Sequence, residues 1–364
     1  MTSRVPVDSL RQFIEALFRA AGFQEEDVRL GTDAFLLQEM RGVQTHALRR
    51  LGQMLDGIGA GEINSRPHRR VLHEHNAIVV VDGDFGLGIS SCMYTMEQAL
   101  RLARRFGIGF SIVVNSNHFL AAAPYCLRAA EQGAIGLAFA NAASGMGYPG
   151  TNVSALGNSP VGFAVPTGAG FPIVFDAALT LSGGKLTQWA KQGERIPDGF
   201  LGYDAAGNFT SDPAAVLDGG VPLPIGLHKG AGLGILTDVL TGVIGGTSFL
   251  RALVPEEHPE WRRTTNTHCF IAIDIEPFMP LPAFRERMAA YVAEIKSKPV
   301  APGYEEILLP GERAARSVED CERHGVPLQD DVVARLTGLS TSYGVPMPFT
   351  TSPVEDPSPF DGQP

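Results

Sequence analysis

The sequence has few cysteines, and the four that it has are far apart. Cys92, Cys126, Cys269 and Cys321 form no C-x-x-C pair, which disfavours a zinc ribbon or a redox dithiol. A chain of 364 residues can bury a large core without disulfide or metal staples. We therefore expect reduced thiols and no metal site, as is usual for a cytoplasmic protein.

Long apolar runs and an excess of positive charge are also missing. Glycine or a polar residue interrupts every apolar stretch before it reaches about 18 positions, the length that suggests a membrane-spanning helix. Met1–Val7 lacks the pattern of a signal peptide. The net charge of −10 disfavours nucleic acid and anionic membrane surfaces as partners. A negative net charge does not exclude a small anionic substrate, because a local cationic pocket is enough to bind one.

Known phosphate-binding glycine motifs are absent or incomplete. There is no G-x-x-x-x-G-K-[ST], and the segment Gly86–Ser91 matches a dinucleotide fingerprint only in part, with Ser91 in the third glycine position. The next predicted strand ends in Val114-Asn115-Ser116, without the acidic residue that would bind ribose hydroxyls. We interpret Gly83–Ser91 as a structural turn that leads into a helix.

Periodicity separates the chain ends from the middle. Apolar residues at helical spacing predict helices near the N-terminus, and β-branched runs alternate with helical patterns further on, which indicates an α/β or α+β centre. A glycine-interrupted apolar segment at 223–250 predicts a buried helix. The predicted helices are 8–18, 25–40, 47–58, 93–106, 121–132, 282–295 and 329–336, and the predicted strands are 77–82, 110–114, 135–140 and 268–274.

His46 lies among small and polar residues, and Arg50 follows it four positions later. On a helix, two residues at this spacing share a face. Imidazole and guanidinium are a minimal set for handling a 2-oxo acid, because the arginine pairs with the carboxylate and the histidine exchanges a proton with the neighbouring oxygen. The alternative is a helix start with His46 and Arg50 at the surface. Thr45 either orients the imidazole or caps the helix.

Three further residues are candidates for a site, each with a structural alternative. His118 follows a predicted strand in a polar turn, where ligands are often bound, or it is a hydrogen-bonded structural histidine. Asp176 ends an apolar run and either binds ribose hydroxyls or caps a helix. Lys229 precedes an apolar helix and suits an anion such as a diphosphate, or it is an exposed turn lysine. His268 opens an apolar strand and is interpreted as structural.

Taken in order, several motifs resemble the malate/L-lactate dehydrogenase-like oxidoreductases, which differ from the Rossmann-type lactate and malate dehydrogenases. The same family includes ureidoglycolate and sulfolactate dehydrogenases, diketogulonate reductase and cyclic-imine carboxylate reductases. The resemblance covers about residues 8–340. The motifs that carry it are Thr45–Leu51, Asn115–Phe119, Leu156–Pro160, Phe175–Asp176, His228–Leu233 and Leu309–Glu312.

The resemblance implies an α+β protein with a non-Rossmann cofactor domain. This domain has a central, mostly antiparallel sheet, and a helical domain is built from both chain ends. We expect an N-terminal helical part at 1–72, a sheet domain that binds NAD or NADP at 73–275 and a C-terminal helical part at 276–344. A proline-rich tail follows at 345–364. The family also implies a homodimer.

The resemblance further implies roles for individual residues. It places the catalytic histidine at His46, next to Thr45, and the arginine that binds the substrate carboxylate at Arg50. In different members, the histidine at His118 either contacts the cofactor or transfers a proton. The residues expected to bind the cofactor are His118, Phe119, Leu120, Asp176, Ala177, Ala178, Lys229, Gly230, Pro310, Gly311 and Glu312. Asn158 occupies a position that often touches substrate.

The sequence departs from the family pattern at several positions. Ala47 and Leu120 replace usual glycines, and Asn158 stands where threonine is usual. The segment Asp176–Lys185 is one residue shorter than usual, and Lys185 takes a position where some members carry an aspartate. We therefore assign no charge relay through an aspartate.

We expect an oxidoreductase that transfers a hydride between NAD(P)H and a small 2-oxo or 2-hydroxy carboxylic acid. Two alternatives remain open. One is a reductase of a cyclic imino carboxylate, in which the same arginine and nicotinamide would serve a C=N bond. The other is a catalytically silent binding protein of the same fold. The substrate and the preference between NAD and NADP are left open.

Overall fold

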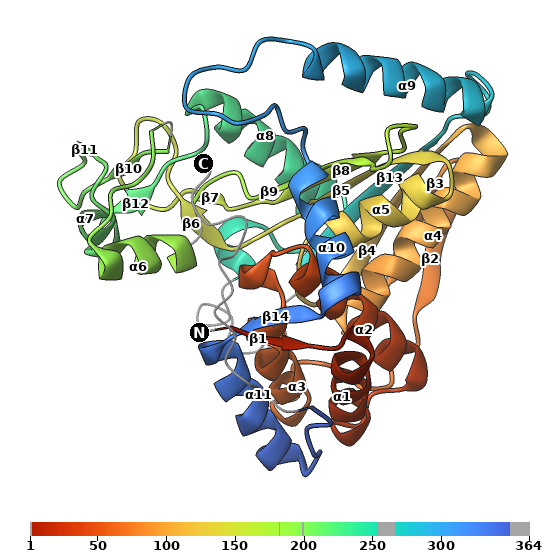
Figure 1. The fold of residues 1–364 in the computed structure, drawn as a ribbon, viewed down its shortest axis with the longest axis horizontal. Helices are drawn as coiled ribbons and strands as arrows, with labels where there is room; N and C mark the ends of the chain where they lie inside the picture. The colour runs from red at the N-terminus through yellow and green to blue at the C-terminus, as the bar shows by residue number, and fades with distance from the viewer. Residues whose placement is uncertain (1, 182, 199, 254–265, 350–364) are drawn as a thin grey trace. The chain divides into compact units, whose positions relative to one another are not determined.

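The computed structural model describes residues 2–181, 183–198, 200–253 and 266–349. The chain forms two compact units (Figure 1). The terminal unit comprises residues 1–66 and 311–364, and the central unit comprises residues 67–310. The domain boundaries predicted at 72, 275 and 344 stay a prediction, and the predicted tail lies outside the described residues from 350 onward.

The terminal unit is mostly helical. The predicted helix at 8–18 is confirmed as α1, whose five largest apolar side chains, from Leu10 to Phe18, are buried. Burying side chains of this size contributes about 1.5–3 kcal/mol each. Its helices are α1 (Val7–Ala20), α2 (Glu25–Met40), α3 (Leu51–Gly59), α10 (Glu312–His324) and α11 (Asp330–Tyr343). The two chain ends meet in an antiparallel pair, β1 (Thr2–Val5) with β14 (Val326–Gln329).

The helix predicted at 47–58 is wrong in its first turn. Gln44–His46 and Leu48–Arg50 are separate 3₁₀ turns, η1 and η2, and α3 begins only at Leu51. Between the turns, Ala47 has φ −133° and ψ −141°, which is far from helical values. The prediction that His46 and Arg50 share one helix face is therefore wrong.

The central unit is built on a seven-stranded sheet with the order β2-β3-β4-β13-β5-β8-β9. β3 and β4 are parallel, and the other described neighbours in this sheet are antiparallel. The α+β class with a mostly antiparallel sheet is thus confirmed. The strands are β2 (Arg70–His75), β3 (Ile78–Asp82), β4 (Ile108–Ser116), β5 (Ala134–Ala140), β8 (Val161–Val165), β9 (Ile173–Ala177) and β13 (Asn266–Asp274).

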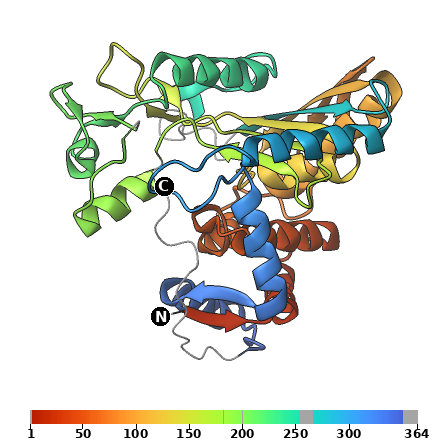
Figure 2. The same ribbon diagram turned by 45° about the horizontal axis from the view of Figure 1, so that its top comes forward.

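Helices pack against both faces of this sheet. On one face, α4 (Gly88–Phe106) and α5 (Ala123–Glu131) enclose a core cluster that includes Tyr125 and Phe270. On the other face, Ile112, Phe139 and Cys269 pack with Leu240. The helix α9 (Leu281–Lys296) lies alongside the sheet (Figure 2). It packs against β8 and β9 through Val292. None of the described helices is long and apolar enough to cross a membrane.

The remaining elements of the central unit are short. The predicted buried helix at 223–250 is only partly correct, because α8 gives way to a π-helical turn and leaves Leu233 and Leu236 each 45% exposed. The elements are β6 (Ser144–Met146), β7 (Leu156–Gly157), α6 (Gly183–Gln192), β10 (Gly202–Tyr203), β11 (Phe209–Thr210), α7 (Pro213–Leu217), β12 (Val221–Pro222), α8 (His228–Asp238), the π turn η3 (Val239–Val243) and the 3₁₀ turn η4 (Leu250–Leu253).

Gly109 sets how closely β4 approaches α4, and it provides a test of this packing. A Cβ at Gly109 would lie 1.9 Å from the carbonyl oxygen of Ala99. We expect Gly109→Ala to lower the free energy of unfolding by about 1–3 kcal/mol, because the core must spread. Gly338→Ala is the control, since no atom lies within 4 Å of its Cβ position and a helical alanine gains about 0.5–1 kcal/mol. If urea denaturation gave both variants equal free energies of unfolding, the close approach of β4 to α4 at Gly109 would be contradicted.

Candidate active site

His118 lies in a turn between β4 and α5, and its tautomer is defined. The Leu120 N–H donates to His118 Nδ1 at 3.1 Å, so the proton of the neutral ring is on Nε2. Leu120 has φ +66°, a left-handed conformation that costs a side-chain-bearing residue about 1–2 kcal/mol. The position that holds glycine in the family pattern thus keeps the backbone conformation that glycine favours.

The glycine-rich segment at 83–88 packs against this turn. The Asn117 side-chain amide donates to the carbonyls of Phe85 at 2.8 Å and Gly86 at 3.0 Å. A Cβ at Gly88 would lie 2.2 Å from the Asn117 carbonyl oxygen, so glycine lets the start of α4 approach the turn. These contacts support the interpretation of the segment as a structural turn before a helix.

Asp176 stands near the end of β9 and holds the start of α5. Its Oδ2 accepts a hydrogen bond from the Ala123 N–H at 2.8 Å, which satisfies a backbone donor at the helix N-terminus. This hydrogen bond supports the alternative in which Asp176 caps a helix. A contact between Asp176 and a cofactor stays a prediction. Two residues earlier on β9, the Val174 N–H donates to the Pro310 carbonyl at 3.0 Å.

A chain of backbone hydrogen bonds extends from β9 to the start of α8. The Leu179 N–H donates to the Asn158 carbonyl at 3.0 Å, and the Ile225 N–H donates to the Leu179 carbonyl at 2.8 Å. The Gly230 N–H then donates to the Ile225 carbonyl at 3.0 Å. Within the central unit, the structure thus brings together five separate stretches of chain that contain predicted cofactor or substrate residues, those near His118, Asn158, Asp176, Lys229 and Pro310.

The polar groups of this region fit a pyridine nucleotide. Asn158 Oδ1 and Ser159 Oγ are buried and have no hydrogen-bond partner among the described residues, so they can pair with amide or hydroxyl groups of a ligand. Lys229 is exposed in the first turn of α8, whose N-terminus has no side-chain cap. A cation at a helix N-terminus suits a diphosphate. The side chains of Phe119 and Leu120 are buried, so this turn offers a ligand the His118 ring and backbone groups.

In the terminal unit, Thr45 links His46 to Arg50. The Thr45 hydroxyl lies 2.9 Å from His46 Nδ1, and Arg50 Nε donates to the Thr45 carbonyl at 3.4 Å. Neither 3₁₀ turn has a side-chain cap, which favours the orienting role for Thr45 over the capping role. The two functional groups thus contact one threonine without sharing a helix.

His46 is a neutral imidazole at neutral pH. Partial burial, and then the nearby Arg50 guanidinium, lower its pKa to about 4. A neutral imidazole can accept a proton. It can act as a proton donor only after a nearby negative charge raises its pKa and the ring becomes protonated.

The adjacent arginines, Arg49 and Arg50, have different partners. Arg49 forms a two-pronged ion pair with Asp331, with nitrogen–oxygen distances of 2.8 and 2.9 Å, and also donates to Gln44 at 2.8 Å. Arg50 is exposed and has no carboxylate partner among the described residues; its Nη1 donates to the neutral Gln53 side chain at 2.9 Å. The charge available for a substrate carboxylate is therefore that of Arg50.

Glu39 is a residue of this segment that the sequence reasoning missed. It lies buried on α2, and its Oε2 accepts the Leu48 N–H at 3.1 Å. Burial raises its pKa to about 7. No motif in the sequence distinguished Glu39 from the other acidic residues of its helix, because its partner is a backbone group.

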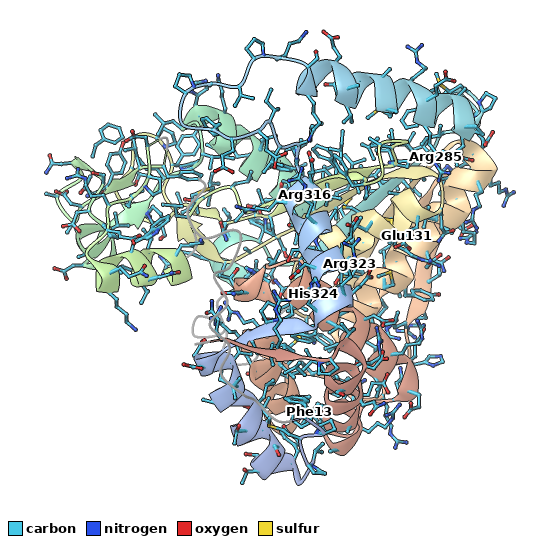
Figure 3. All side chains as sticks on the ribbon, viewed as in Figure 1. Phe13, Glu131, Arg285, Arg316, Arg323 and His324 are labelled. Carbon is cyan, nitrogen blue, oxygen red and sulfur yellow. The ribbon has the colours of Figure 1, made fainter. Side chains whose placement is uncertain are left out.

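Two predicted residues stand at the start of α10. Gly311 has φ +87° and precedes the helix, and the carboxylate of Glu312 is paired with Arg316 at 2.6 Å. Figure 3 labels Arg316 on this helix. Glu312 is 4% exposed. Its predicted role in binding the cofactor stays a prediction.

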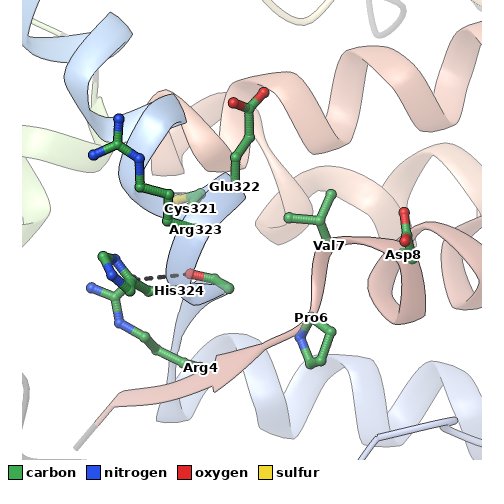
Figure 4. Close-up of a pocket in the computed structure, with 9 residues that line it drawn as sticks. Arg4, Pro6, Val7, Asp8, Cys321, Glu322, Arg323 and His324 are labelled. Carbon is green, nitrogen blue, oxygen red and sulfur yellow. Dashed lines mark hydrogen bonds between the residues drawn. The ribbon is translucent and has the colours of Figure 1, made fainter.

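A cavity of about 410 Å³ lies in the terminal unit between the start of α1 and the end of α10 (Figure 4). Both of its arginines have partners: Arg4 contacts Asp320 at 2.8 Å and the Gly325 carbonyl at 3.0 Å, and Arg323 contacts Glu319 at 3.6 Å. None of the residues predicted for the site lines it. Across the described part of the chain, no group of His, Cys, Asp and Glu side chains is placed to hold a metal ion.

Comparisons with known proteins identify the family of the chain. The family model described as malate/L-lactate dehydrogenase matches residues 5–337. The chain is 33% identical over 350 residues to a malate dehydrogenase of Pyrococcus horikoshii, covering 94% of this chain and 96% of that protein. It is 28% identical to a Δ¹-pyrroline-2-carboxylate/Δ¹-piperideine-2-carboxylate reductase of Pseudomonas putida, with coverage of 94% and 97%.

The fold agrees as well. The crystal structure of malate dehydrogenase from Entamoeba histolytica superposes with a TM-score of 0.89 at 26% identity, covering 96% of this chain and all of that one. The chain belongs to the malate/L-lactate dehydrogenase family of pyridine-nucleotide-dependent oxidoreductases.

Proposed function

We propose that the protein transfers a hydride between NADH or NADPH and a small 2-oxo or 2-hydroxy carboxylic acid. The observation that carries this proposal is the pair of His46 and Arg50 on one threonine, with the Arg50 charge uncommitted to any carboxylate among the described residues. The nicotinamide supplies the hydride chemistry when bound. The relative that acts on malate, by its name, supports the substrate class.

Arg50 binds the substrate carboxylate in this proposal. A guanidinium forms two parallel hydrogen bonds with a carboxylate. Arg49 is committed to Asp331, and this pair anchors the segment from which Arg50 extends.

His46 exchanges the proton on the neighbouring oxygen. With a pKa near 4, the ring is unprotonated at neutral pH and can accept the hydroxyl proton when a 2-hydroxy acid is oxidised, although the lowered pKa makes it a weaker base. A carboxylate bound to Arg50 neutralises one of the two causes that lower this pKa, so the protonated ring needed for reduction becomes easier to form. His118, with its proton on Nε2, is the second candidate for proton transfer, or it contacts the cofactor.

The nucleotide is assigned to the central unit. Lys229 and the start of α8 bind the diphosphate, and the segment at 176–178 contacts the remainder of the nucleotide. Pro310 completes the central-unit residues expected to hold it, and the contacts expected of Gly311 and Glu312, in the terminal unit, stay predictions. Asn158 contacts the substrate in this proposal. The preference between NAD and NADP is tested by titrating the protein with NADH and NADPH and following nicotinamide fluorescence. Failure to bind either would favour a silent binding protein.

The carboxylate role of Arg50 makes a direct prediction. Arg50→Ala should raise KM for an active 2-oxo acid about 10- to 100-fold, because a charge-assisted hydrogen bond contributes about 1.5–3 kcal/mol, and should also lower kcat. Arg29→Ala is the control, since Arg29 is an exposed arginine of the same unit and its loss should leave KM unchanged. Unchanged kinetics of Arg50→Ala on every active acid would remove Arg50 from the site.

The proton-transfer role predicts the behaviour of two further variants. His46→Ala or His118→Ala should lower kcat about 10²- to 10⁴-fold, the range for losing a general acid or base. The assay is the absorbance of NADH or NADPH with a panel of 2-oxo acids and one cyclic imino carboxylate. Wild-type rates in both variants would contradict the assignment, and activity on the cyclic imine alone would favour the chemistry named for the Pseudomonas putida relative.

An apolar face on α8 and the π turn supports a homodimer. Leu236, Val239 and Val243 are 45%, 42% and 51% exposed and follow each other at helical spacing, with Ile244 at 60% nearby. The only charged residue between Gly230 and Phe249 is Asp238, and its side chain is buried. An uncharged apolar helix face of this kind is self-complementary across a two-fold axis.

The dimer can be tested through this face. Leu236→Asp should shift the protein from dimer to monomer in sedimentation velocity, because the partner surface would bury an unpaired carboxylate. Leu217→Asp is the control, since Leu217 is equally exposed at 47% but lies on α7. A Leu236→Asp protein that stays dimeric would place the interface elsewhere.

A further inference from the structure

His268 is a buried histidine with two contacts on the His118 turn. It lies on β13 and is 1% exposed. Its Nε2 lies 2.9 Å from the Asn117 carbonyl, to which it donates. Its ring is stacked on that of Phe119, with centroids 4.7 Å apart and planes 12° from parallel. His268 thus holds the residues immediately before and after His118.

The turn needs such support because its backbone is strained. The bond from the Leu120 N–H to His118 Nδ1 forms while Leu120 is in a left-handed conformation. Strained backbone persists only where surrounding contacts over-determine it. Tyr125 adds to these contacts, since its hydroxyl donates to the Phe119 carbonyl at 2.6 Å and its ring is stacked on Phe119 at 5.5 Å.

An apolar side chain would pack in the core at the position of His268 without burying an unpaired nitrogen. The Nδ1 of His268 is buried without a hydrogen-bond partner among the described residues, which costs free energy that an apolar side chain would avoid. Burial lowers its pKa to about 4, so the ring is neutral and donates from Nε2. A phenylalanine would supply the flat ring without the donor, and a glutamine would supply a donor without the ring.

We infer that His268 is a positioning residue that fixes the orientation and tautomer of His118 through Asn117 and Phe119. The inference rests on the proposed function, in which His118 serves the cofactor or the proton transfer. His268 itself has no part in the chemistry, because its ring is enclosed in the core.

Two variants separate the two contacts, and a third controls for damage to the strand. His268→Phe keeps the ring and removes the donor, and His268→Gln keeps a donor and removes the ring. Cys269→Ala alters the next residue of β13, whose side chain packs with Ile112 and Phe139 on the opposite face of the sheet. Urea denaturation of all three shows how far each is destabilised.

The first measurement uses the full chain without any ligand. Long-range ¹⁵N NMR of protein labelled in histidine reports the tautomer of each ring, and His118→Gln identifies the His118 signal. We expect the Nε2–H tautomer in the wild type and in Cys269→Ala. We expect a mixture of tautomers in His268→Phe and His268→Gln, because the turn no longer holds the Leu120 N–H against Nδ1.

The second measurement is steady-state kinetics with an active 2-oxo acid. Both His268 variants should lose about tenfold or more in kcat, as misplaced catalytic groups do, with KM for the acid within about twofold. Cys269→Ala should keep wild-type kcat at a comparable loss of stability. A His118 tautomer that is unchanged in both His268 variants, or that shifts equally in Cys269→Ala, would overturn the inference. A wild-type protein that binds neither NADH nor NADPH would instead contradict the proposed function, and the NMR result would still stand.

Discussion

The candidate nucleotide site depends on backbone hydrogen bonds along one stretch of chain, from Val174 to Leu179. These bonds reach the carbonyls of Pro310 and Asn158, and through Ile225 they reach the start of α8. The Asp176 carboxylate adds α5 to the same region. Five stretches far apart in sequence are thereby held together without a glycine-rich phosphate loop.

In the same region, the backbone of several non-glycine residues has a positive φ. Leu120, Ser159 and Leu227 have φ of 66°, 28° and 54°, and each lies in a segment expected to contact ligand. Such conformations cost free energy and cluster at functional sites, where packing enforces them. At Leu120, the buried side chain and the stacked rings of Phe119 and His268 provide that packing.

Charge pairing distinguishes the two adjacent arginines of the terminal unit. Arg49 and Arg50 are identical in sequence terms, but Asp331, which belongs to α11 near the other chain end, neutralises only Arg49. The buried Glu39 fixes the adjacent backbone at Leu48. Together these contacts anchor the two residues that follow Ala47, so that Arg50 extends from a defined backbone although no continuous helix carries it.

The sequence by itself determined the amphipathic helix at 8–18, the α+β class and the motif order that identifies the family, because periodicity and short motifs are local properties. It also favoured a structural turn over a Rossmann loop at 83–88, because the acidic residue of the fingerprint is missing. Only the tertiary structure decided that Ala47 interrupts the helix, that Arg49 is paired and that His268 contacts the His118 turn. Each of these depends on partners tens to hundreds of residues away or on a backbone conformation that propensity does not encode.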